Sequence, residues 1–151
     1  KRVYRSFKEE VPEDAYEIEI GKAKVVNEGD DLTVVTWGAP VFQCLEAMDN
    51  LPEDVSIELI DLRSIYPWDV DTVVESVRKT GRCVIVHEAP MTAGFGAEVS
   101  SRIQEECFLH LHAPVQRVTG FDTIMPYYKL ELEYLPEAPR IKKGIEECLA
   151  Y

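Results

Sequence analysis

Residues 68–86 read WDVDTVVESVRKTGRCVIV, and they contain the clearest structural pattern in the sequence. Asp69 is a favourable N-cap, and Trp68 before it can pack onto the first turns of the helix that follows. Gly81 suits the position just beyond a helix end, and Cys83–Val86 is an apolar run typical of a buried parallel strand. The stretch therefore predicts a helix that leads directly into a central strand. One face of this helix carries Val70, Val73, Val74 and Val77.

The same alternation of strands and helices continues on both sides. Toward the N-terminus lie a strand over 32–37, a helix between Gly38 and Asn50–Pro52, and a strand over 55–60. Toward the C-terminus lie a loop over 88–96, a helix over about 97–109, a strand over 114–119 and a helix with Pro139 in its first turn. This order predicts a three-layer α/β fold, with a mostly parallel open sheet, one antiparallel edge strand and helices on both faces.

The antiparallel strand is expected from a hairpin near the N-terminus. Residues 23–26 and 32–37 form its two arms, and Gly29 in the turn between them supplies a positive φ. Residues 1–20 are expected to be a linker or arm, although Tyr16–Ile20 alternates in a way that favours one further edge strand. The domain proper is expected over residues 21–151.

The composition is that of one globular domain. The 151 residues include 28 Asp and Glu against 16 Lys and Arg, so the net charge is −12. This charge disfavours nucleic acid and anionic membrane surfaces as partners, and no apolar run is long enough to span a membrane. It favours a basic protein surface, although by itself it indicates no more than solubility. The four scattered cysteines predict reduced, buried thiols in an intracellular protein, and a start at Lys1 without Met predicts a fragment.

Several polar residues follow strands, at the edge where ligands of open α/β sheets collect. His87 and Glu88 end one strand, and a structural hydrogen-bonded pair at a subunit interface is favoured over acid–base catalysis. Asp61 and Arg63 follow another strand. They can pair with each other, or Arg63 can hold a carboxylate of a neighbouring subunit, and both interpretations stay open. Asp122 is expected to cap the turn that follows it.

No nucleotide or metal site is predicted. Gly94-Phe-Gly96 begins like a dinucleotide fingerprint, but Val99 stands where the third glycine belongs. These two glycines are therefore expected to let the chain enter a helix in close contact with its neighbours. His110 and His112 lack a third ligand at a useful spacing, so a solvated helix end is expected there.

Seven segments, taken in their order and spacing, are more specific than any single residue. They are IDLR (60–63), PWDVDT (67–72), KTGR (79–82), HEAP (87–90), GF (94–95), QEECFL (104–109) and RVTGFDT (117–123). Together they resemble the C-terminal domain of the β subunit of thiamine diphosphate-dependent 2-oxo acid dehydrogenases. PWDVDT and QEECFL resemble the branched-chain type most, with the pyruvate type as the alternative. The opening residues resemble the family's link from a preceding domain.

The resemblance implies a transketolase C-terminal-like fold. It also implies a parent enzyme of two α and two β subunits (α₂β₂) that decarboxylates 2-oxo acids oxidatively and passes the acyl group to lipoyl. Thiamine diphosphate and Mg²⁺ would bind between the α subunit and the N-terminal domain of β, so no catalytic, cofactor-binding or metal-binding residue is implied here. The implied role is at subunit contacts. The interface or strand-end candidates are Arg63, Trp68, His87, Glu88 and Asp122.

The resemblance further implies a dock for the Arg-rich subunit-binding domain of the lipoyl acyltransferase. Related enzymes use the C-terminal carboxylate of the β subunit, here Tyr151, and an acid before an Ala-Pro pair, where this chain has His112. The expected location is the mitochondrial matrix of a eukaryote or the cytoplasm of a prokaryote. The rival hypothesis is a stand-alone module that binds a small anion in a crevice between Arg63, His87 and Asp122.

Overall fold

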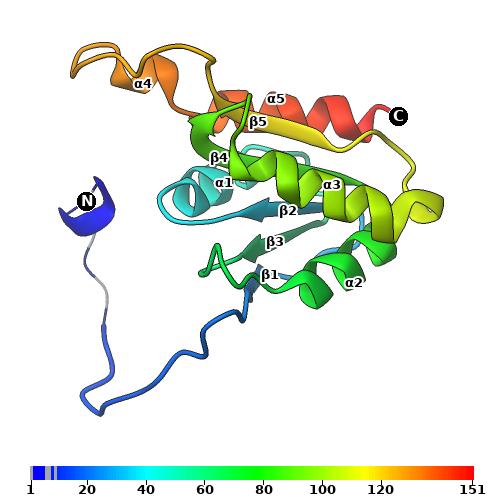
Figure 1. The fold of residues 1–151 in the computed structure, drawn as a ribbon, viewed down its shortest axis with the longest axis horizontal. Coiled ribbons are helices and arrows are strands. Elements are labelled where there is room, and N and C mark those ends of the chain that lie inside the picture. Colours follow the sequence, from blue (N-terminus) through cyan, green and yellow to red (C-terminus); the bar gives the residue numbers. More distant parts are fainter. Residues whose placement is uncertain (1, 6–7, 9) are drawn as a thin grey trace.

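The computed structural model describes all residues except 1, 6–7 and 9, and a five-stranded sheet of order β1-β3-β2-β4-β5 forms its centre (Figure 1). The strands are β1 (Lys24–Asn27), β2 (Leu32–Thr36), β3 (Ile57–Asp61), β4 (Cys83–Pro90) and β5 (Gln116–Gly120). The α-helices are α1 (Pro40–Met48), α2 (Val70–Thr80), α3 (Phe95–Cys107), α4 (Glu131–Tyr134) and α5 (Ala138–Leu149). Two short 3-10 helices are η1 (Arg2–Arg5) and η2 (Phe108–His110).

Helices cover both faces of the sheet, so the predicted three-layer α/β architecture is confirmed. Strands β2 to β5 run parallel, and β1 is the antiparallel edge strand. Successive side chains of a strand point to opposite faces, so Val34 joins the apolar cluster under α1 and α5, and Val35 joins the cluster under α2 and α3. All four cysteines are buried, as predicted, and burial raises the pKa of Cys44 to about 12.

The helix α2 has the predicted caps. The carboxylate of Asp69 accepts hydrogen bonds from the N–H groups of Thr72 (3.3 Å) and Ala23 (3.1 Å). Burial by itself would raise the pKa of Asp69, but these bonds and the charge of Lys22 lower it overall. Gly81 ends the helix with a φ of 68°. The hydrogen bond between Ala23 and Asp69 fastens the start of α2 to the chain that enters β1.

The predicted hairpin is wrong, because β1 pairs with β3 and not with β2. The connection from β1 to β2 crosses the amino end of β3. Gly29 permits this crossing: a Cβ at that position would lie 2.5 Å from the carbonyl oxygen of Ile57. Its role is close approach and not a positive φ, which occurs at Gly21, Gly38 and Gly81. Asp31 and Ser56 fasten the crossing through two hydrogen bonds of 2.7 and 2.9 Å.

Three boundary predictions also differ from the structure. Tyr16–Ile20 forms no strand, because its alternating side chains find no partner strand within the described residues and remain exposed. The strand β4 continues to Pro90, so part of the predicted loop is sheet, and α3 begins at Phe95. The last turn of that predicted helix is the 3-10 helix η2. Within the described residues, no helix combines the length and the apolar character that crossing a membrane requires.

Candidate functional site

Four aromatic side chains meet at the carboxyl edge of the sheet, where the parallel strands end. Trp37 follows β2 and stacks on His87 of β4, with ring centres 5.3 Å apart and an interplanar angle of 14°. Phe95, in the first turn of α3, meets Trp37 edge-on at 5.4 Å. Trp68, just before α2, meets Phe95 edge-on at 6.3 Å. This aromatic cluster fills the edge where open α/β sheets commonly bind ligands.

His87 is fully buried within this cluster. The predicted hydrogen bond between His87 and Glu88 is wrong, because neighbouring strand residues point to opposite faces and Glu88 is exposed. Neither ring nitrogen of His87 makes a hydrogen bond of normal geometry. Burial and the charge of Arg117 lower the pKa of the ring, and the nearby backbone of Ala89 only partly opposes this shift. In this structure His87 is therefore enclosed by its neighbours, and burial favours the neutral form of its ring.

The two glycines at the start of α3 pack against this histidine. A Cβ at Gly96 would lie 2.5 Å from Cδ2 of His87, and one at Gly94 would lie 2.7 Å from its Cε1. The prediction that they allow close contact at a helix start is confirmed. The space that a diphosphate would require beside these glycines is filled by the imidazole ring.

Arg63 and Asp122 lie at the same edge, but they make their hydrogen bonds with other residues and not with His87. Asp61 accepts a hydrogen bond from the backbone N–H of Arg63 (3.0 Å), and the two side chains form no ion pair in the described chain. Asp122 does not cap the turn that follows it. Its carboxylate accepts hydrogen bonds from the N–H (2.8 Å) and hydroxyl (2.6 Å) of Thr92, and these bonds lower its pKa. Asp122 thus connects the loops that follow β4 and β5.

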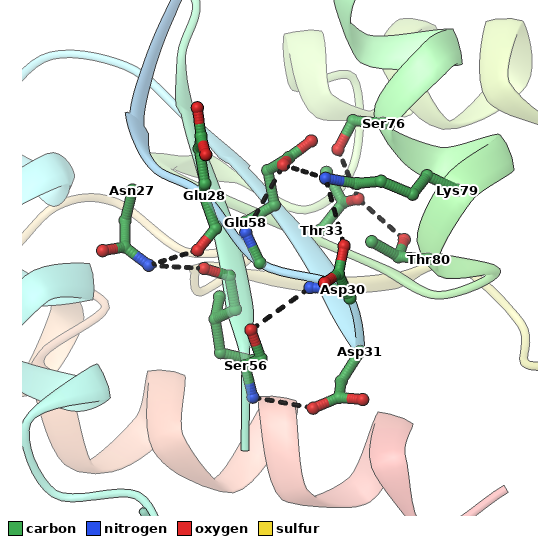
Figure 2. Close-up of polar contacts among 12 residues, drawn as sticks. Asn27, Glu28, Asp30, Asp31, Thr33, Ser56, Glu58, Ser76, Lys79 and Thr80 are labelled. Carbon is green, nitrogen blue, oxygen red and sulfur yellow. Dashed lines mark hydrogen bonds and ion pairs between the residues drawn. The ribbon is translucent and has the colours of Figure 1, made fainter. Parts of the chain in front are cut away.

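The opposite, amino edge holds a polar network that sequence reasoning missed (Figure 2). Glu58 is buried near the start of β3, forms an ion pair with Lys79 of α2, and accepts a hydrogen bond from Gly29 N–H. Burial by itself would raise the pKa of Glu58, but its hydrogen bonds and the charge of Lys79 lower it. Lys79 also reaches Asp30 at 3.6 Å. The network joins the end of α2 to the crossing connection, and stability is its evident role.

The two docking candidates also lie at this amino edge. The backbone N–H of His112 donates to the carbonyl of Gly81 (2.8 Å), just before β4. The Sγ of Cys148 donates to the carbonyl of Cys83 (3.9 Å), which brings the end of α5 and then Tyr151 to the same side. Figure 1 shows the C-terminus on the side opposite α4. The structure therefore separates the interface or strand-end candidates from the docking candidates.

The family model of the transketolase C-terminal domain matches residues 21–141. The chain belongs to the transketolase C-terminal domain family. A solved relative with this fold, the inactive beta4 tetramer of a split-gene transketolase, superposes with a TM-score of 0.74 at 28% identity. That match covers 94% of this chain and 46% of the other. The family membership confirms the transketolase C-terminal-like fold that the sequence motifs predicted.

Two curated relatives are more specific than the family model. The chain is 52% identical to the mitochondrial 2-oxoisovalerate dehydrogenase subunit beta of Dictyostelium discoideum, over 100% of this chain and 41% of the relative. It is 46% identical to the pyruvate dehydrogenase E1 component subunit beta of Staphylococcus aureus, over 99% of this chain and 46% of the relative. This family member thus spans less than half the length of these curated relatives.

Proposed function

We propose that this chain is the C-terminal assembly and docking domain of the β subunit of a branched-chain 2-oxo acid dehydrogenase. The whole α₂β₂ enzyme would decarboxylate 2-oxo acids oxidatively and pass the acyl group to lipoyl. The observation that carries the proposal is the 52% identity to the D. discoideum 2-oxoisovalerate dehydrogenase subunit, against 46% for the S. aureus pyruvate dehydrogenase subunit. The pyruvate counterpart is the second candidate on the same grounds. The D. discoideum relative is mitochondrial and the S. aureus relative is bacterial. They support a location in the mitochondrial matrix if this chain comes from a eukaryote, and in the cytoplasm if it comes from a prokaryote.

In this proposal, thiamine diphosphate and Mg²⁺ bind outside this chain. The glycines that could approach a diphosphate are occupied by the ring of His87. The described residues contain no cluster of three or more metal-ligating side chains. These residues do not fit the cofactor, so no step of the reaction is assigned to them. Residues 21–151 would form the domain, and residues 1–20 would connect it to a preceding domain.

The docking half of the proposal concerns the amino edge. His112 lines a hollow of about 380 Å³ together with Phe108 and Pro114. Tyr151 follows α5 and is exposed. The net charge of −12 favours association with an Arg-rich domain, because opposite potentials steer encounter. His112 stands where related enzymes use an acid, so in this proposal the docking contact shifts to other acids of the domain and to the region of Tyr151 after α5.

Two calorimetric titrations of the 151-residue chain test this function. An Arg-rich subunit-binding domain of a lipoyl acyltransferase should bind with one site and weaken as salt rises, because screening reduces the attraction. Thiamine diphosphate with Mg²⁺ should give no binding isotherm. A stoichiometric isotherm with the cofactor, or no binding of the Arg-rich domain at low salt, would contradict the proposal.

The rival small-anion module lacks support from the geometry. Its crevice requires Arg63, His87 and Asp122 to face one ligand. His87 is fully buried, and the carboxylate of Asp122 is occupied by Thr92. Titration with inorganic phosphate provides the corresponding control, and we expect no binding.

A further inference from the structure

We propose that His87 is an acid-sensitive switch. In the structure its ring lies against residues 94–96, the segment that enters α3. Protonation of the ring would move this segment away from β4 and open the carboxyl edge of the sheet. The switch goes beyond the proposed function, because docking is proposed for the opposite, amino edge.

The surroundings of His87 suit a neutral ring and not a cation. The ring is fully buried, and neither of its nitrogens makes a hydrogen bond of normal geometry. A neutral imidazole leaves one donor and one acceptor unpaired there, whereas an imidazolium brings two N–H donors and a full charge. An unpaired buried charge costs far more than an unpaired polar group, so a protonated ring must reach water or an acceptor.

The charges around the ring also oppose the cation. Among the described residues, no carboxylate makes a hydrogen bond with His87. Glu88 points to the other face of the sheet, the carboxylate of Asp122 is bound elsewhere, and Glu98 in the first turn of α3 is exposed. The strand β5 contributes the cation Arg117, which acts with burial to lower the pKa of the ring.

The start of α3 is the neighbour that can give way. The strands β2 and β5 are both hydrogen-bonded to β4 within the sheet. Residues 94–96 instead meet the ring of His87 by close packing. A Cβ at Gly94 would lie 2.7 Å from its Cε1, and a Cβ at Gly96 would lie 2.5 Å from its Cδ2. A short movement of this segment would therefore bring water to the ring.

The loop before α3 offers a hinge for this movement. Residues 91–93 are exposed. Thr92 is fixed by two hydrogen bonds to Asp122, so the movement would begin at the next residue. Ala93 has a φ of 60°, a conformation that costs energy in a residue with a side chain. A change of φ at Ala93 would relieve this strain as residues 94–96 leave the ring.

Opening would also separate the aromatic cluster. Phe95 lies between the two glycines and contacts both Trp37 (5.4 Å) and Trp68 (6.3 Å). The uncharged Trp37 covers the β2 side of the ring of His87. Withdrawal of Phe95 would expose both indole rings to water. The sequence contains two tryptophans, and both belong to this cluster, so tryptophan fluorescence reports on the carboxyl edge.

The pH range follows from the two states of the ring. In the open state the ring is solvated, and its pKa should be near the ordinary value of 6.5, whereas burial lowers the pKa in the closed state. Between these two pKa values, the ratio of open to closed molecules rises by up to about tenfold for each pH unit. The edge therefore stays closed above pH 6.5 and opens progressively below it.

Tryptophan emission of the 151-residue chain, recorded from neutral pH downward, tests the switch. We expect the emission maximum to move to longer wavelength below pH 6.5, while the far-ultraviolet circular dichroism stays constant. The maximum is the decisive quantity, because protonation can change the intensity of a stacked indole without any movement. An NMR titration of the His87 ring should give a midpoint below 6.5 that coincides with the shift in emission.

Three results of these titrations would overturn the inference. The first is a titrating His87 ring with an unchanged emission maximum. The second is a midpoint of the ring at or above 6.5. The third is a shift in emission that coincides with loss of the circular dichroism signal, because the whole chain then unfolds and no local opening precedes it.

Variants separate His87 from the other two histidines. The matched control His110→Gln/His112→Gln removes both exposed histidines and should keep the transition. The variant His87→Phe should lack it, because a phenyl ring cannot be protonated. Persistence of the transition in His87→Phe, or its disappearance in the control, refutes the switch. If His87→Phe does not fold, the NMR titration of the parent chain still decides.

Hydrogen exchange locates the movement. The N–H of Ala97 donates to the carbonyl of Gly94 (2.9 Å) at the start of α3. Below pH 6.5 the protection of the amides of residues 94–97 should fall relative to amides in the middle of α5 at the same pH. Equal loss of protection in α3 and α5 would indicate global unfolding and would exclude a local switch.

Discussion

Replacing Gly29 by Ala should destabilise the chain strongly, because the connection between β1 and β2 has no room for a side chain where it crosses β3. A Cβ at this position would lie 2.5 Å from the carbonyl oxygen of Ile57 and 2.6 Å from the amide nitrogen of Glu58, both backbone atoms that cannot turn away. The crossing segment would have to retreat by about 1 Å to reach ordinary contact distance. The hydrogen bonds between Asp31 and Ser56 would then break.

The magnitude follows from these two effects. Overpacking costs about 1–3 kcal/mol, and two lost hydrogen bonds add about 1 kcal/mol each, so the free energy of unfolding should fall by about 3–5 kcal/mol. Urea unfolding followed by circular dichroism should show a midpoint lower by about 1.5–2.5 M, for a slope of about 2 kcal/mol/M. Gly38→Ala is the matched control. Its Cβ would meet nothing within 4 Å, so only the φ of 70° matters, at about 1–2 kcal/mol. Equal losses in the two variants would refute the crossing argument.

Three further predictions concern titration and docking. Burial and Arg117 lower the pKa of His87 below its ordinary 6.5, so the native state favours the neutral ring. Protonation of His87 should leave the free energy of unfolding unchanged above pH 6.5 and should lower it as the pH falls below 6.5. Urea titrations at several pH values should therefore show a weaker dependence of this free energy on pH in His87→Phe. An equal pH dependence in the variant would contradict the lowered pKa of His87. The hydrogen-bonded ion pair lowers the pKa of Glu58 below 4.5, so its stabilisation is present above that pH and is lost as pH falls through the native value. The variant Glu58→Gln should not show this loss of stability in acid. An acid-unfolding transition identical to that of the parent chain would contradict the lowered pKa of Glu58. Removing the last two residues, which end in Tyr151, should weaken calorimetric binding of the Arg-rich domain at low salt, whereas unchanged affinity and salt dependence would exclude a carboxylate dock.

Local patterns were sufficient for the helices and the parallel strands. The valines of α2, its N-cap Asp69 and its terminal Gly81 all act within one element, where spacing along the chain determines spacing in the structure. The pairing of β1 was different, because the choice of β2 or β3 as partner depends on contacts between residues 32 to 37 positions apart. Gly29 was recognised as special, but a glycine needed for close approach and a glycine needed for a turn look alike in a sequence.

The candidate site shows the same difference between local features, which can be predicted, and long-range contacts, which cannot. Strand ends could be located, so His87, Arg63 and Asp122 were expected at one edge. Which of them face each other could not be determined, since the alternation that buries His87 exposes Glu88. Trp37 and Phe95 gave no local signal for the aromatic cluster. The ion pair between Glu58 and Lys79 joins a strand and a helix that only the fold brings together.

The most direct test of the account is a chimera in which this chain replaces the matching segment of the D. discoideum 2-oxoisovalerate dehydrogenase subunit beta. The measurement is the decarboxylation rate of the chimera after size-exclusion purification with its α subunit. We predict an assembled α₂β₂ enzyme whose kcat stays close to that of the unmodified enzyme, because the proposed function assigns assembly and no catalytic group to this chain. A correctly assembled tetramer that has lost its decarboxylation rate, or a chimera that does not assemble with the α subunit, would contradict the account.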